Sequence, residues 1–338
     1  MGVAIHPLGG EALSARQVGP CRQGWLDASS GVWLAAPVHM IVDCHTHIWQ
    51  SPTQVGLDRV GGRLARTDTD GQATPQQHRQ ASQPVDLTLV LGFKSCYLGG
   101  EVPDSVIAGY VRQHPDRLIG FGGVDPTDLP KALDQMRQGC TELGLKGVTL
   151  SPAAQLMHPA DTRALQLYAE ASRMGLPVIF DADVHRMTAG RMEFAQPMLL
   201  DEVAHQFPQL RIVVSHMGYP WVEQTVVLLG KHAHVLADVS GLLHQPWQAY
   251  NALLSAYHHG VIDKLLFGSD FPYGSATSAI ETLYSLNQIS HGTNLPSIPR
   301  SLLRGIVERN APALLGIAAP SDAPAPVEPE SVVRNERI

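Results

Sequence analysis

The sequence predicts an α/β fold, a closed (β/α)8 barrel of the TIM type, and three observations support this prediction. Short apolar runs recur eight times between Met40 and Ile317. Amphipathic stretches of helical length separate most of these runs. The whole pattern occupies about 275 residues, which is the usual size of such a barrel.

The eight apolar runs have the composition of strands that are buried on both faces. They are short and rich in β-branched residues, as parallel strands covered by helices are. They span residues 40–44, 85–91, 118–124, 147–150, 177–180, 211–215, 235–239 and 264–268. We expect helices over residues 103–114, 129–143, 161–174, 197–207, 221–231, 247–259 and 276–289. An open doubly wound sheet, the alternative, would usually carry a glycine fingerprint after its first strand, where this chain has histidines.

Three segments do not follow this pattern. Residues 1–39 are rich in Gly, Ala, Ser and Pro, so we predict a poorly ordered N-terminal extension before a barrel domain at 40–317. If translation starts at Met40 rather than Met1, N-terminal sequencing of the native protein will find neither Met1 nor Gly2. The polar stretch 50–84 follows the first strand and is either a lid over the barrel mouth or an unstructured insertion. Residues 318–338 have the composition of a disordered Pro- and Ala-rich tail.

Charge and cysteine content exclude several classes of function. The chain has 338 residues, of which 16% are charged, with a net charge of -7 and a pI near 6.1. This balance argues against binding to nucleic acid or to an anionic membrane. The four cysteines are scattered without a Cys-x-x-Cys pair, which is typical of reduced thiols. No apolar run could span a membrane and no signal peptide is evident, so we expect a cytoplasmic protein with a small-molecule substrate. The sequence is also compatible with a homo-oligomer.

Candidate site residues lie at the ends of four predicted strands. His45 and His47 follow the first run at a spacing of two, so on a strand they point the same way and form a pair of nitrogen ligands for a divalent metal. Asp181 follows the fifth run, His216 the sixth and Asp270 the eighth. Because the chemistry of such a barrel takes place at the carboxyl ends of its strands, these side chains should converge at one mouth.

Each candidate also has a purely structural explanation. His216 could bond a neighbouring carbonyl, Asp270 could cap the helix after the eighth strand, and Asp181 could be a solvated loop acid. A second His-x-His, His232 and His234, precedes a strand instead of following one, so we expect it at the opposite end of the barrel.

Aromatic residues occur at the same predicted end of the barrel. We predict that Trp49, Trp221 and Tyr273 contact the substrate, with ordinary packing as the alternative. Lys94, just beyond the second strand, could meet an anionic substrate.

The order of these motifs resembles the amidohydrolase superfamily, specifically its amidohydrolase-related branch, also called amidohydrolase 2. That branch includes aminocarboxymuconate-semialdehyde decarboxylase and related lactonases and decarboxylases of aromatic acids. The matching pieces are Val-Asp-Cys-His-Thr-His at the first strand, Gly-Leu-Pro-Val-Ile at the fifth, Arg-Ile-Val-Val-Ser-His-Met-Gly-Tyr-Pro-Trp at the sixth and Leu-Phe-Gly-Ser-Asp-Phe-Pro at the eighth. Residues 309–316 look like the closing helix of the family.

The resemblance implies a site with one divalent metal ion, zinc in the first place and manganese as the alternative. The resemblance also implies that His45 and His47 are metal ligands and that His216 is a catalytic acid or base. It implies that Asp270 is both a metal ligand and a proton acceptor. The family commonly has a histidine ligand where this chain has Asp181, and the fourth strand lacks the lysine of binuclear relatives. A second carboxylate would neutralise the ion and favour harder metals. Asp181 therefore predicts a weaker or altered metal preference, or a site that works without metal.

Three functional hypotheses follow from this site. The leading one is a metal-dependent hydrolase of an amide, ester or lactone of a small carboxylated substrate, in which Asp270 or His216 takes a proton from metal-activated water. The second is a non-oxidative decarboxylase of a small aromatic or unsaturated acid, in which His216 or Asp270 protonates carbon as carbon dioxide leaves. The third is a catalytically inactive barrel, in which His45→Ala would change no detectable turnover. The same residues serve both reactions, so the sequence does not separate them.

Overall fold

The computed structural model of the chain describes residues 24–26, 33–35, 40–56, 72–182 and 189–318. The chain divides into two units, Met1–His39 and Met40–Ile338. In the first unit, strands β1 (Gly24–Leu26) and β2 (Trp33–Ala35) pair antiparallel. The rest of the predicted N-terminal extension and the predicted tail from residue 319 onward lie outside the described residues.

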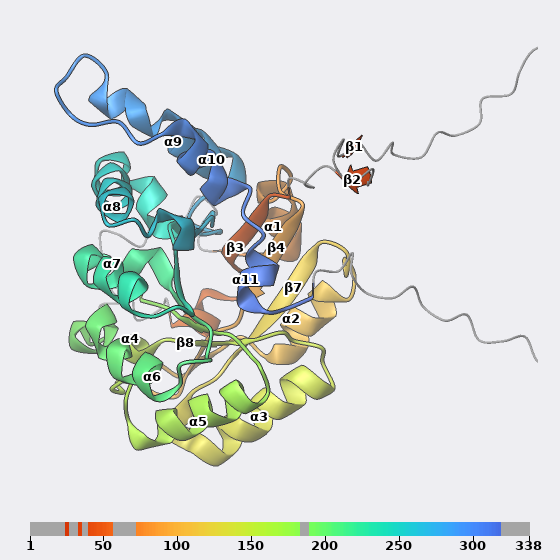
Figure 1. Cartoon of the computed structure of the whole chain (residues 1–338). Helices are drawn as coiled ribbons and strands as arrows, with labels where there is room; N and C mark the ends of the chain where they lie inside the picture. Colours follow the sequence, from red (N-terminus) through yellow and green to blue (C-terminus); the bar gives the residue numbers. More distant parts are fainter. Residues whose placement is uncertain (1–23, 27–32, 36–39, 57–71, 183–188, 319–338) are drawn as a thin grey trace, which may run out of the picture. The chain divides into compact units, whose positions relative to one another are not determined.

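Eight parallel strands form the barrel of the second unit, and each of them overlaps a predicted run (Figure 1). In chain order they are β3 (Val42–His47), β4 (Leu87–Leu91), β7 (Leu118–Gly123), β8 (Val148–Leu150), β9 (Val178–Phe180), β10 (Ile212–Val214), β11 (Val235–Asp238) and β12 (Leu265–Leu266). Sheet order follows chain order, and the last strand meets the first through bonds from Cys44 N to Phe267 O and from His47 N to Phe271 O, both 2.9 Å. The predicted TIM-type barrel is confirmed.

The helices between the strands agree with the predicted ranges to within a few residues. They are α2 (Asp104–Val111), α3 (Leu129–Thr141), α5 (Thr162–Arg173), α6 (Leu200–Gln206), α7 (Val222–Lys231), α8 (Pro246–His258) and α9 (Ala276–Ser285). The side chain of Asp161 accepts a bond from Arg163 N and so caps α5. Shorter elements are the hairpin β5 (Lys94–Ser95) and β6 (Gly100–Glu101), α4 (Pro152–Gln155), α10 (Arg300–Val307) and α11 (Ala311–Leu315). None of the described helices combines the length and the apolar character needed to cross a membrane.

The polar stretch 50–84 contains regular structure that the sequence analysis missed. A 3-10 helix, η1 (Pro52–Val55), follows the first strand, and α1 (Pro75–Ala81) begins at a capping box formed by Thr74 and Gln77. Of the two alternatives for this stretch, the unstructured insertion is therefore wrong for residues 52–55 and 75–81, and the lid stays a prediction. The buried residue of α1 is His78, so the helix has no apolar period that a sequence pattern could detect. Residues 57–71 lie outside the described part of the chain.

Side chains alternate along the strands between the barrel interior and the helices around it. Ile179, Val213 and Leu236 belong to the cluster inside the barrel, whereas their neighbours in sequence pack against the helices. Burying each such side chain stabilises the fold by about 1.5–3 kcal/mol. Because the side-chain period is two, the next interior positions after Ile179 and Leu236 are Asp181 and Asp238. The apolar interior is thus followed by acidic side chains at the carboxyl ends of the strands.

Candidate metal centre

His45 and His47 lie side by side on β3, and their Nε2 atoms are 3.1 Å apart. The Nδ1 atom of His45 donates to Asp238 Oδ2 over 3.0 Å, and that of His47 donates to the carbonyl of Leu91 over 3.2 Å. Because both partners are acceptors, each neutral ring carries its proton on Nδ1 and turns an Nε2 lone pair toward the other. Two nitrogen ligands of one tetrahedral zinc ion lie roughly 3.3 Å apart. The pair therefore has the spacing of two metal ligands and, when both rings are neutral, the orientation of their lone pairs as well.

Asp238, which the sequence analysis did not select, holds this arrangement from the end of β11. Its Oδ2 accepts from His45, and its Oδ1 accepts from the backbone nitrogens of His216 and Ser240 at 3.0 and 3.1 Å. Burial raises the pKa of Asp238, but the charge and hydrogen bond of His45 outweigh it and bring the pKa to about 2. Burial likewise lowers the pKa of His45, whereas the charge and hydrogen bond of Asp238 raise it to about 9. A carboxylate in this position fixes the orientation of a histidine ligand and raises its basicity.

His216 follows β10 in the short helix η6 (Ser215–Gly218) and has a left-handed backbone, with φ of 53°. The backbone nitrogen of Gly241 donates to its Nδ1 over 2.9 Å, so the proton of the neutral ring sits on Nε2. That Nε2 lies 3.9 Å from Asp181 Oδ1, and the ring centre lies 4.6 Å from that of His45. His216 therefore presents an N–H group, which suits a proton donor better than a metal ligand.

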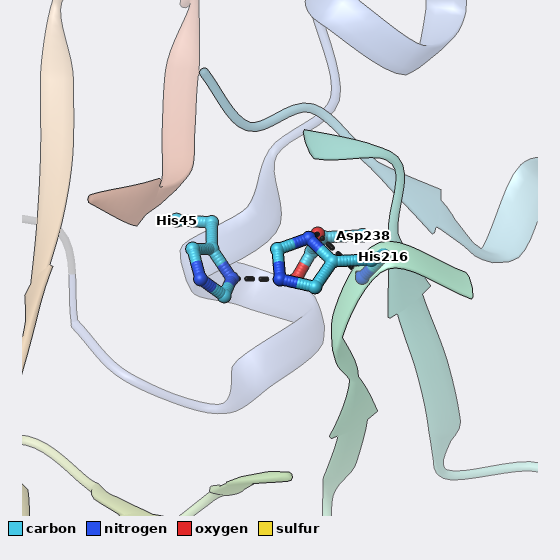
Figure 2. A group of neighbouring side chains, drawn as sticks. All are labelled: His45, His216 and Asp238. Carbon is cyan, nitrogen blue, oxygen red and sulfur yellow. Dashed lines mark hydrogen bonds and ion pairs between the residues drawn. The ribbon is translucent and has the colours of Figure 1, made fainter. Parts of the chain in front are cut away.

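His45, His216 and Asp238 converge from three separate elements (Figure 2). All three are buried, and the atoms with which they could bind a metal lie within 4.8 Å of one another. A group of this size is suited to a single metal ion. Since both oxygens of Asp238 already accept hydrogen bonds, we interpret Asp238 as the partner that orients His45, which leaves Nε2 of His45 as the atom that faces the ion.

The two predicted carboxylates lie close to this group. Asp181 Oδ2 accepts from Ser151 Oγ over 3.2 Å, and Asp270 donates its backbone nitrogen to His45 O over 3.0 Å. Both carboxylates act on the ring of His45, where their charges raise its pKa in addition to the larger effect of Asp238. Asp270 is buried and has a φ of 62°, a backbone conformation that aspartate adopts more readily than most residues. The structure thus gathers the five predicted metal and catalytic residues at one end of the barrel.

The predicted substrate-contacting aromatics separate into two places. Trp49 is 2% exposed, and its ring centre lies 6.4 Å from that of half-buried Tyr273. Trp221 is half-buried at the start of α7 and packs against Ala153 and Ala195. Of these three residues, Tyr273 is the nearest in sequence to Asp270. Their contact with a substrate stays a prediction.

The structure adds one histidine to the surroundings of the site and shows that a predicted lysine is already paired. His244, which was not selected, ends η7 (Ser240–His244) with Nε2 3.3 Å from Asp270 Oδ2 and 31% of its side chain exposed. No pattern in the sequence marks it, because its position depends on how the loop after β11 folds. Lys94 is buried, and its ammonium group donates to Glu101 and Gln135 at 2.8 and 2.7 Å, so its charge is already paired.

The second His-x-His lies away from this site. His232 ends α7, and its Nε2 is 2.7 Å from Asp201 Oδ1, a surface carboxylate that also pairs with Lys231. It precedes β11, whereas Asp238 is the last residue of that strand.

A (β/α)8 barrel with histidines and carboxylates gathered at the carboxyl ends of its strands defines the class of metal-dependent barrel enzymes. The chain belongs to the amidohydrolase family, in its amidohydrolase 2 branch, because the model of that family matches residues 42–317. It is therefore an enzyme of the amidohydrolase type. A search of curated protein sequences finds no significant match.

Solved structures with the same fold include two decarboxylases and a hydrolase. A 5-carboxyvanillate decarboxylase from Sphingomonas paucimobilis is 14% identical with a TM-score of 0.59, over 83% of this chain and 100% of that one. A dihydroxybenzoic acid decarboxylase from a Polaromonas species, with bound manganese and the inhibitor 2-nitroresorcinol, is 16% identical with a TM-score of 0.58, over 82% and 97%. A probable 2-pyrone-4,6-dicarboxylic acid hydrolase from Acinetobacter baumannii is 18% identical with a TM-score of 0.53, over 82% and 99%.

Proposed function

We propose that the enzyme is a non-oxidative decarboxylase of a small aromatic or unsaturated acid, with one divalent ion as its cofactor. The observation that carries the proposal is the composition of the candidate ligand set, which is the Nε2 pair of His45 and His47 together with Asp181 and Asp270. Two carboxylates cancel the charge of a divalent ion. Such a centre acidifies water less than a zinc ion with three neutral histidines does, so it is better suited to holding an acidic substrate than to generating hydroxide.

The donor set fits a hard divalent ion. Carboxylates with imidazole are ligands that manganese accepts readily, and the two facing lone pairs of His45 and His47 need a cation or a proton between them. The manganese in the Polaromonas decarboxylase supports this choice over zinc. When bound, the ion would polarise the carboxylate of the substrate and a neighbouring hydroxyl or enol oxygen.

The reaction breaks the bond between the carboxylate carbon and the carbon that bears it, and the electron pair stays on the latter. In its doubly protonated form, with the Nδ1 proton bonded to Ser240 Oγ at 2.8 Å, His216 would deliver its Nε2 proton to that carbon as carbon dioxide leaves, and the ring would end neutral. Asp270 would hold the substrate hydroxyl proton, with His244 Nε2 at 3.3 Å from its Oδ2. A proton from water would then restore His216.

Hydrolysis of a lactone is the second candidate. It is favoured by the likeness to the probable 2-pyrone-4,6-dicarboxylic acid hydrolase, whose substrate is a cyclic ester with two carboxylates. The same residues would act, with Asp270 as the base for water and His216 as the donor to the carbonyl oxygen.

The two candidates differ in their product. The full-length protein, loaded with Mn²⁺ or with Zn²⁺, is assayed for carbon dioxide release from hydroxybenzoic acids and for ring opening of pyrone carboxylates. We expect carbon dioxide from at least one acid, with turnover lower by about 100-fold or more in His216→Gln. Turnover should be unchanged in His232→Gln, the matched change at a half-buried histidine away from the site. Ring opening without any carbon dioxide would establish the hydrolase instead, and His45→Ala with unaltered turnover would reject both.

A further inference from the structure

A cavity of about 100 Å³ lies between α1, the first residues of β4 and the end of α2. It is separate from the candidate metal centre, because its lining includes none of the ligand residues. Four buried polar side chains form its inner wall, namely His78, Ser82, Thr88 and Tyr110. Three basic side chains stand around it, namely Arg79, His114 and Arg117. A space of this size admits a small oxyanion.

The two arginines of this cavity lack an acidic partner. Arg79 Nη1 lies 3.4 Å from His114 Nε2, and Arg117 Nη2 donates to the carbonyl of Val85 over 2.5 Å. Across the described residues, neither guanidinium has a carboxylate within 4.0 Å. Asp86, close in sequence to Val85, instead accepts a bond from the backbone of Ile41. Most donors of both guanidinium groups are therefore available to a ligand.

The charges of both arginines act on Tyr110, which lines the same cavity. Burial raises the pKa of Tyr110 to about 12, and the charges of Arg79 and Arg117 both act against that rise. Both arginines line the same cavity as Tyr110. Arginines are the residues that proteins use most to bind an oxyanion through paired N–H groups.

The inner wall is neutral and already hydrogen-bonded. Thr46 Oγ1 donates to the carbonyl of Leu89 over 2.7 Å, so it accepts the Nε2–H of His78 over 2.9 Å. The Nδ1 atom of His78 is then an acceptor for the hydroxyl of Tyr110 at 2.8 Å. Both ring nitrogens of His78 are hydrogen-bonded and the ring is neutral, so His78 adds no charge to the cavity. The net charge that faces the cavity comes from its arginines.

We propose that this cavity binds a phosphate group through Arg79 and Arg117, with His114 as an additional donor. A phosphate carries close to two negative charges at neutral pH, which matches two guanidinium groups without acidic partners. The phosphate can be the free ion or the end of a phosphorylated small molecule. The cavity is lined near the starts of β4 and β7, by Thr88 and Leu118, whereas the candidate ligands lie at or beyond the carboxyl ends of their strands, so it is independent of the proposed decarboxylation.

The test is calorimetric titration of the full-length protein with inorganic phosphate, at ionic strength held constant with sodium chloride. We expect a saturable binding event that Arg79→Gln weakens about tenfold or more, because Arg79 is exposed and its loss leaves the fold intact. Arg112→Gln is the matched control, since Arg112 is also an exposed arginine near α2 but does not line the cavity. We expect it to bind phosphate as the wild type does.

Two results would overturn the proposal. One is the absence of saturable binding in the wild type, and the other is identical titration of Arg79→Gln and the wild type, which would place the phosphate elsewhere, such as at the metal centre. Circular dichroism confirms that each variant is folded. A parallel titration with glycerol 3-phosphate distinguishes the two sources of the ligand. If glycerol 3-phosphate binds more tightly than inorganic phosphate, the ligand is a phosphorylated metabolite, and if it binds more weakly, the ligand is the free ion.

Discussion

At the scale of single residues, Asp238 determines which nitrogen of His45 is available. Its Oδ2 accepts the hydrogen bond of Nδ1–H, so Nε2 is the nitrogen that faces His47 and is left for an ion. The same carboxylate holds the backbone of His216 through its other oxygen. One buried acid therefore orients both a candidate ligand and the candidate proton donor.

Asp238→Asn should lower the affinity for Mn²⁺ by about 10- to 100-fold, because an amide orients His45 less firmly and leaves it less basic. Metal content after dialysis against defined free Mn²⁺ measures the effect. Asp201→Asn, which changes a surface acid paired with Lys231, is the control and should bind metal normally. Equal affinity in Asp238→Asn and the wild type would mean that Asp238 does not support the metal centre.

Asp181→His tests the charge argument at the site. It would convert a neutral set of two histidines and two carboxylates into one with three histidines, which favours zinc over manganese. Elemental analysis of both proteins, purified without chelator or added metal, should show more zinc in the variant. A full complement of tightly held zinc in both proteins would contradict the argument.

At the scale of elements, the start of η7 sets the position of His216. A Cβ atom at Gly241 would lie 2.7 Å from His216 Nδ1, closer than side chains normally approach. Gly241→Ala should therefore displace the ring and lower turnover by about 100-fold while metal content stays unchanged. In Gly230→Ala the added Cβ meets only Val261 at 3.8 Å, so this variant should keep wild-type turnover. Loss of turnover in both variants would make the effect nonspecific.

Helix α1 makes folding stability depend on pH through His78. Burial lowers the pKa of His78 to about 3, whereas the unfolded chain takes up the proton near pH 6.5. The unfolded state therefore binds more protons between these values, and stability falls as the pH drops from about 6.5 toward 3. At pH 5 the loss from this residue alone is about 2 kcal/mol.

Urea unfolding at pH 7.5 and pH 5 measures this contribution. His78→Gln should reduce the difference in unfolding free energy between the two pH values by about 2 kcal/mol, even if the variant is less stable overall. His259→Gln changes an exposed histidine and should keep the wild-type difference. An unchanged difference in His78→Gln would show that this ring does not titrate as described.

The sequence predicts elements better than it predicts their mutual contacts. All eight strands coincide with apolar runs, and the candidate residues lie at the end of a strand (His45 and His47) or shortly after one (Asp181, His216 and Asp270), which is a local signal. Asp238 is embedded in an apolar run, so its role became visible only once β3 and β10 were brought next to it. His78 is a buried polar residue in a polar segment, and its partners Thr46 and Tyr110 are both 32 positions away. Long-range pairing of this kind leaves no periodic pattern in one sequence.

At the scale of the whole molecule, every barrel strand lies in the unit from Met40 onward. We propose that this unit folds without the first 39 residues. A protein that begins at Met40 should unfold cooperatively within about 2 °C of the full-length chain and bind the same amount of metal. Differential scanning calorimetry and metal analysis measure both. Aggregation of the shortened protein, or a Tm lower by more than about 5 °C, would show that residues 1–39 contribute to its stability.

The barrel closes where its first and last strands meet, and the candidate ligands stand on both sides of that junction. Ser269 N bonds Asp43 Oδ1 over 2.9 Å, although the two residues are 226 positions apart. A nascent chain that has not yet emerged beyond Asp270 thus cannot assemble the complete centre. An ion shared by β3 and the segment after β12 would cross-link the two edges of the sheet. Chelation should then speed hydrogen exchange at Cys44 and His47, the amides that span the junction, before it affects the strands opposite.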